Sequence, residues 1–62
     1  MKESANIKRY GLLLAKYAEI EGMKTANLKN SQNSVPPVYE DIDYVKVAGE
    51  IEEIVYRPDD LL

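Results

Sequence analysis

The side chains with the most chemical potential in this sequence are acidic and occur in two groups. Glu40, Asp41 and Asp43 form one group, and Asp59 and Asp60 form the other. Carboxylate oxygens are the ligands that Mg²⁺ and Ca²⁺ prefer, but neither group has the loop spacing of a calcium hand. We therefore expect solvated carboxylates, with no bound metal and no cofactor.

Residues suited to catalysis are scarce. The sequence contains no His and no Cys, so the commonest general base and the thiol nucleophile are missing. Its serines fall at an expected helix cap or in a polar connection, and its glycines are too far apart to form a phosphate-binding loop. We expect a protein without catalytic residues that is not an enzyme.

Small residues recur at helical spacing in the first half of the chain. Gly11, Ala15, Ala18 and Gly22 follow one another at intervals that place them on one stripe of a helix. Such a stripe lets another backbone approach closely, which compensates for the cost of about 1 kcal/mol that Gly carries inside a helix. Together with larger apolar neighbours they give the predicted interface residues: Gly11, Leu14, Ala15, Tyr17, Ala18, Gly22, Ile51 and Val55.

The first element expected to carry these residues is a helix over about residues 4–28, with Ser4 as its N-cap. Its apolar and small residues cover about 220° of the helical wheel, and Lys16, Arg9 and Glu19 lie opposite as the predicted solvent face. An alternative ends this helix at Gly22, as a C-terminal cap.

A polar connection over about residues 29–38, containing two prolines, should follow. We expect a second helix over about residues 39–56, stopped by Pro58, and a frayed tail over residues 57–62. The alternative for the second element is a β-hairpin with strands 44–47 and 51–56 that turns at Gly49 and Glu50.

The expected fold class is therefore all-α: a two-helix antiparallel hairpin in one small domain. Chains of 62 residues bury only about 60% of their unfolded surface, so the core needs support from elsewhere. The wider apolar arc of the first helix predicts a homo-oligomer, with a dimer favoured. In that arrangement the small-residue stripes meet in a four-helix bundle, and the side with Ile7, Tyr10, Leu14 and Tyr17 receives the second helix. A different protein partner is the alternative.

Charge is divided unevenly along this acidic chain. Residues 1–30 contain six Lys and Arg against three Glu, whereas residues 31–62 contain two against eight Asp and Glu, so the halves should attract. The longest apolar run is too short for a membrane span, and we expect a cytoplasmic protein that acts through protein–protein association. The alternative is a decoy that inhibits a nucleic-acid-binding protein, because several carboxylates could imitate phosphates: Glu40, Asp41, Asp43, Glu50, Glu52 and Glu53. The dispersed lysines do not favour direct binding of nucleic acid.

Overall fold

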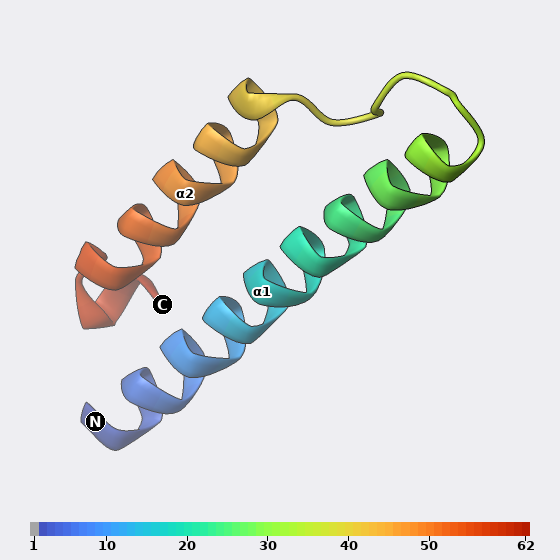
Figure 1. Cartoon of the computed structure of the whole chain (residues 1–62). Helices are drawn as coiled ribbons and strands as arrows, with labels where there is room; N and C mark the ends of the chain where they lie inside the picture. The colour runs from blue at the N-terminus through green and yellow to red at the C-terminus, as the bar shows by residue number, and fades with distance from the viewer. Residues whose placement is uncertain (1) are drawn as a thin grey trace.

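The computed structural model contains two antiparallel helices joined by a loop (Figure 1). Helix α1 spans Lys2–Gln32, α2 spans Asp41–Tyr56, and a short 3₁₀ helix, η1, spans Asp59–Leu61. The structure describes residues 2–62, and side chains from residue 4 onward. No strand occurs in this range, so the all-α hairpin is confirmed and the β-hairpin alternative is excluded.

Helix α1 is longer at both ends than the expected helix. It includes Lys2, so Ser4 lies within the helix instead of capping it, and it continues through Gly22. It ends where Ser34 adopts a left-handed φ of 56°, which brings the Ser34 N–H to the Ser31 carbonyl at 3.1 Å and the Val35 N–H to the Asn30 carbonyl at 2.8 Å. These are the two hydrogen bonds of a Schellman motif, formed here by Ser where Gly is usual.

The two ends of helix α2 are set by residues that favour helix termination, an acidic capping residue at the start and a proline after the end. The Glu40 N–H donates to the Asp43 carboxylate at 2.8 Å, so this acid satisfies a backbone donor at the start of the helix. Pro58 follows the last turn and prevents its continuation. The tail expected to fray instead forms η1, which packs against α1.

The two helices form a single thin layer. The Cα atoms extend over 50 × 17 × 10 Å, and their radius of gyration is 14.9 Å, against about 11 Å for a compact chain of this length. Among the residues whose burial is described, only Ala5, Met23, Val47 and Ile54 are buried. The helix pair therefore has a narrow core and two broad sides.

Candidate protein interface

One end of the hairpin is held by Arg9. Its Nε–H donates to the Ile54 carbonyl at 3.2 Å, and its Nη2 donates to the Arg57 carbonyl at 2.7 Å and to the Asp59 carboxylate at 2.9 Å. The Ile54 carbonyl belongs to the last turn of α2 and also accepts a hydrogen bond from the Arg57 N–H at 3.4 Å. Arg9 thus binds α2, the residue that follows it and η1 at once.

The other end is held by Asn27. Its side-chain amide accepts a hydrogen bond from the Tyr39 N–H at 2.9 Å and donates to the Tyr39 carbonyl at 2.8 Å and to the Tyr44 hydroxyl at 3.2 Å. Nothing in the local sequence marks Asn27 as a contact between the helices. The available signal was its spacing of eighteen residues from Arg9, which at about 3.6 residues per turn places both on one face of α1.

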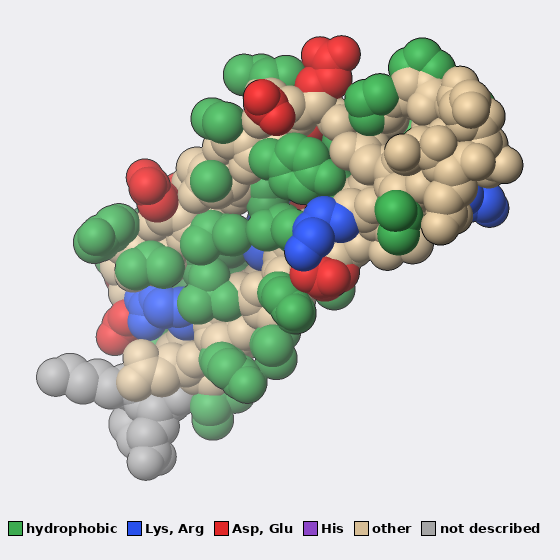
Figure 2. Space-filling model, viewed as in Figure 1, with side chains coloured by type: hydrophobic (Ala, Val, Ile, Leu, Met, Phe, Trp, Pro, Cys, Tyr) green, Lys and Arg blue, Asp and Glu red, His purple; other side chains and the backbone are tan. Residues whose placement is uncertain are grey.

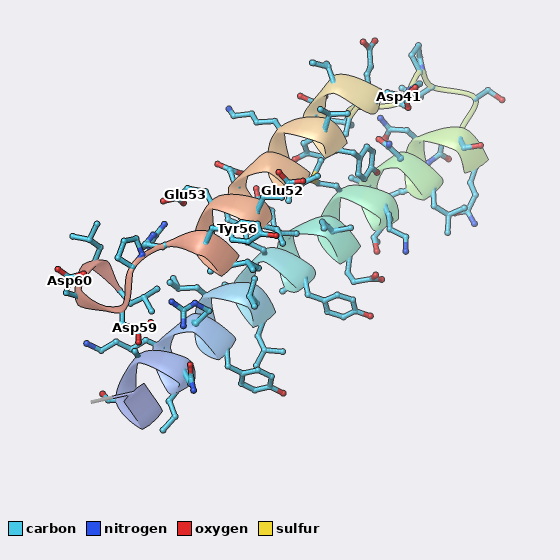
Figure 3. All side chains as sticks on the ribbon, turned by 90° about the vertical axis from the view of Figure 1, so that its left-hand side faces the viewer. Asp41, Glu52, Glu53, Tyr56, Asp59 and Asp60 are labelled. Atoms are coloured by element: carbon cyan, nitrogen blue, oxygen red, sulfur yellow. The ribbon has the colours of Figure 1, made fainter. Side chains whose placement is uncertain are left out.

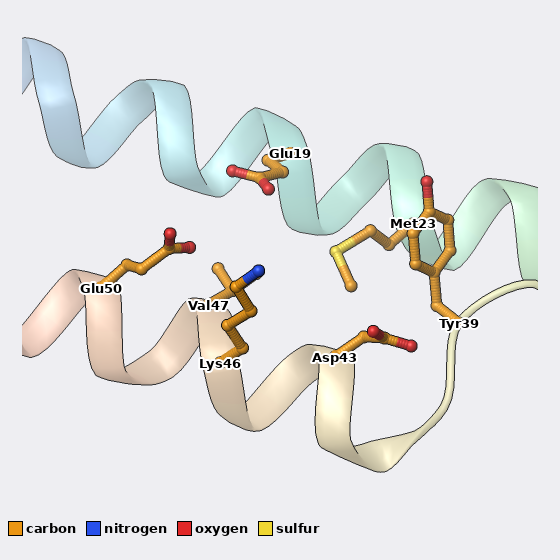
Figure 4. Close-up of a pocket in the computed structure, with 7 residues that line it drawn as sticks. All are labelled: Glu19, Met23, Tyr39, Asp43, Lys46, Val47 and Glu50. Carbon is orange, nitrogen blue, oxygen red and sulfur yellow. The ribbon is translucent and has the colours of Figure 1, made fainter.

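One broad side of the hairpin is polar. Lys16 of α1 binds Glu50 of α2 at 3.1 Å and Glu19 of its own helix at 3.2 Å. These two carboxylates raise the pKa of Lys16, chiefly through the hydrogen bond to Glu50 and then through the one to Glu19. Beside this cluster lies a hollow of about 180 Å³, bordered by both helices and by Tyr39 (Figure 4). Its other lining residues are Glu19, Met23, Asp43, Lys46, Val47 and Glu50.

The opposite broad side is apolar. Nine residues correspond to about two and a half helical turns, so Tyr10 lies across α1 from Glu19, and Val55 lies across α2 from Lys46. Figure 2 shows hydrophobic side chains gathered over both helices on one side of the molecule. We call this side the apolar face, and it consists of Tyr10, Leu13, Tyr17 and Ile20 of α1 and Tyr44, Ala48, Ile51 and Val55 of α2, with Leu14 on its outer edge.

Much of the apolar face is open to solvent. Tyr10 is 65% exposed, Tyr17 60%, Leu14 50% and Val55 45%, while Ile51 is half-buried against α1. Soluble monomers scatter exposed apolar residues singly, whereas a contiguous patch marks a surface for association. Three of the predicted interface residues belong to this face, namely Tyr17, Ile51 and Val55, and Leu14 lies on its outer edge.

The four small predicted interface residues are all exposed and lie elsewhere on α1. Gly11 and Ala18 border Leu14 on the edge of α1 that points away from α2, and Ala15 and Gly22 turn toward the polar side. A Cβ atom added at Gly11 or Gly22 would meet no neighbouring atom within 4 Å. The hairpin itself therefore makes no use of their small size.

The side of α1 that receives α2 differs from the expected one. Arg9 and Lys16 were predicted to lie on the solvent face, but both point toward α2. Arg9 binds the backbone of α2, and Lys16 binds Glu50. The residues expected beneath α2, which are Ile7, Tyr10, Leu14 and Tyr17, are exposed. The long aliphatic stems of Arg and Lys can cover apolar surface while their charged ends bind partners. For this reason the positions of charged residues on the helical wheel predicted the wrong side of α1 for the contact with α2.

Most of the acidic side chains are spread along α2 and η1, where Figure 3 labels five of them. Four of the six proposed phosphate mimics have local roles: Glu40 and Asp43 form the N-terminal capping box of α2, Glu50 binds Lys16, and Glu53 binds Arg57 at 3.0 Å. The hydrogen bond to Arg57 lowers the pKa of Glu53 and raises that of Arg57. Asp41 and Glu52 are exposed on α2.

Among the described side chains, no three potential metal ligands gather into a group. Within residues 2–62, no helix combines the length and apolar character needed to cross a bilayer. The arrangement offers two surfaces: one carries the ion pairs of Lys16 together with exposed Ile42, and the other is apolar and open. Comparisons with models of protein families, with curated proteins and with solved structures found no match for this chain.

Proposed function

We propose that this protein is a non-enzymatic helical module that acts through self-association, with the apolar face as its interface. The observation that carries the proposal is the continuity of exposed apolar side chains across both helices, from Tyr10 and Tyr17 on α1 to Val55 on α2. Burial of such a face is the main favourable term in protein association. A dimer formed in this way is a four-helix bundle with two apolar sides joined.

The surface area of the hairpin supports this proposal. Its accessible surface is 4963 Å², about 900 Å² more than the ~4000 Å² expected for a compact chain of 7.0 kDa. A standard interface removes about 800 Å² from each partner. One apolar face covered by one partner would bring the exposed area close to that of an ordinary small protein.

The proposed interface consists of the larger apolar residues, whereas the interface predicted from the sequence centred on the small ones. The apolar face contains Tyr17, Ile51 and Val55, whereas Leu14, Gly11 and Ala18 lie at its border. Ala15 and Gly22 turn toward the polar side and are not required for this association.

The acidic-decoy alternative has less support. A phosphate mimic needs free carboxylates at regular positions, and Glu40, Asp43, Glu50 and Glu53 are bound within the hairpin. Direct binding of nucleic acid is similarly weakened, since Arg9 and Lys16 are engaged with α2 and η1.

Sedimentation analysis over micromolar concentrations tests the proposal. We expect a dimer for the natural sequence, and at least tenfold weaker association for Tyr17→Lys and Val55→Lys. Both sites are exposed, so these changes leave the hairpin able to fold. A concentration-independent monomer of the natural sequence would refute self-association.

Val45→Lys is the matched control. Val45 is 62% exposed and lies nine residues from buried Ile54, hence on the edge of α2 away from α1 and outside the apolar face. It makes the same apolar-to-charged change on the same helix as Val55→Lys. If Val45→Lys weakens association as much as Val55→Lys, the apolar face is not the interface.

A further inference from the structure

The geometry points to a specific arrangement of two copies, in which α1 of each hairpin lies across α2 of the other. This inference rests on the proposed self-association and names its occupant and orientation. Two symmetric arrangements bury the apolar face. With the two-fold axis parallel to the helices, α1 faces the partner's α2, and with the axis perpendicular to them, each helix faces its own copy.

Charge favours the first arrangement. The segment of residues 1–30 carries six Lys and Arg against three Glu, whereas residues 31–62 carry two against eight acids. Placing α1 across a second α1 brings two basic helices together. Placing α1 across a partner's α2 joins opposite charges along the interface, which fixes orientation as well as rate of association.

Lys24 supplies a local instance of this complementarity. It follows Tyr17 by seven residues and lies on the same side of α1, with only Glu21 as an ion-pair partner among the described residues, at 3.2 Å. Within one hairpin, Met23 lies level with the segment from Asp43 to Val47. An axis parallel to the helices preserves this level, so Lys24 comes close to the partner's first α2 turn, which contains exposed Asp41.

Side-chain size favours the same arrangement. On α1 the apolar face has Tyr10 and Tyr17, seven residues apart, and on α2 it has the smaller Ala48 and Val55, also seven residues apart. Lys16 is level with Glu50 and Arg9 is level with Arg57, so Tyr17 would meet the partner at Ala48 and Tyr10 would meet it at Val55. Large side chains opposite small ones interdigitate, whereas Tyr against Tyr and Ala against Ala leave the layer uneven.

A distance measurement separates the two arrangements. The sequence has no Cys, so Leu28→Cys provides one spin-label site, at an exposed position near the loop end of α1. With axes about 10 Å apart, the inferred arrangement keeps the two labels level at about 20 Å. The alternative separates them to roughly 35 Å, because each lies about twelve residues from the middle of the hairpin at 1.5 Å per residue.

The outcomes distinguish the two proposals. A distance of about 20 Å supports the inferred arrangement, and roughly 35 Å overturns it while leaving self-association in place. Absence of dipolar coupling, with monomeric sedimentation of both labelled and natural chains, overturns both.

A charge exchange gives an independent measurement. Lys24→Glu and Asp41→Lys should each weaken association about three- to fivefold, as expected for an exposed pair, and the double variant should recover it. Equal additive losses would overturn the assignment of this pair. Lys29→Glu with Asp41→Lys is the control combination, since Lys29 lies outside the apolar face, and it should show no recovery.

Discussion

Arg9 and Asn27 lie five helical turns apart on the same face of α1, and each binds one end of the segment that contains α2. Arg9 donates to backbone carbonyls around the end of α2, while Asn27 pairs with the backbone of Tyr39, just before α2 begins. Since few residues are buried between them, these two polar groups fix the register of the helices along each other.

Replacing Arg9 by Met tests the first of these anchors. Met retains an apolar stem but leaves the carbonyls of Ile54 and Arg57 without this donor, so we expect a loss of about 1–3 kcal/mol of unfolding free energy. Urea unfolding followed by circular dichroism, at one fixed protein concentration, measures it. Lys8→Met is the control, because Lys8 is exposed, and an equal loss there would contradict the role of Arg9.

Asn27→Asp tests the second anchor. The change preserves the shape and the acceptor but removes the two hydrogen bonds that the amide donates, so we expect destabilisation by about 1–2 kcal/mol in the same unfolding measurement. Gln32→Glu adds the same charge near the same helix end at an exposed side chain, and it should cost only a few tenths of a kcal/mol. Similar losses at both sites would show that charge, not hydrogen bonding, is responsible.

Ser34→Gly should stabilise the hairpin. Ser34 holds a left-handed φ of 56°, which costs a non-glycine residue about 1 kcal/mol, and Gly offsets only part of this gain through its freedom in the unfolded chain. We expect thermal unfolding to shift upward by a few degrees. Ser31→Gly, inside α1, is the opposite case and should lower the midpoint.

Gly22→Ala separates the stability of the helix from its association. An added Cβ meets nothing within 4 Å, so we expect about 0.5–1 kcal/mol of stabilisation from helix propensity. Because Gly22 lies outside the apolar face, the sedimentation-derived Kd should stay unchanged. A Kd weakened tenfold or more would instead restore the small-residue stripe as the interface.

The ion pair between Lys16 and Glu50 has a predictable pH dependence. The pKa of Lys16 is raised in the folded state, so its contribution is complete below its ordinary value of 10.5 and disappears as the pH rises through the folded-state pKa. Glu50→Gln should lower that pKa toward 10.5, as followed by NMR titration of the lysine ε protons. Glu52→Gln, at an exposed position on the same helix, should leave it in place.

The helices and their antiparallel pairing follow from the sequence because apolar residues recur at the helical period in both halves. Pro58 and the polar linker mark the limits of the second helix correctly to within two residues. The predicted start of α1 was wrong. Ser4 is of a residue type that commonly caps helices, but α1 already includes Lys2.

The prediction of which side of α1 contacts α2 was wrong for a different reason. A helical wheel assigns Arg9 and Lys16 to solvent by their charge, but the contact depends on carbonyls and carboxylates that only the folded hairpin brings within reach. Asn27 likewise resembles a loop residue in isolation, and its role depends on the backbone of Tyr39, twelve residues later.

The candidate interface was foreseeable in part. The excess of apolar surface on the first helix is visible in the sequence, and Leu14 and Tyr17 remain exposed in the structure. The side on which Ile51 and Val55 join them depends on how α2 is rotated against α1, which Arg9 and Asn27 set through their backbone contacts.

Because Arg9 and Asn27 lie at the two ends of the hairpin, the residues that hold the helices in register are different from the residues of the apolar face. Hydrogen bonds at the two ends hold the register of the helices. Substitutions on the apolar face can therefore change the affinity of association in small steps without shifting one helix along the other. Under the proposed self-association, substitutions there change partner preference while the architecture of the hairpin persists.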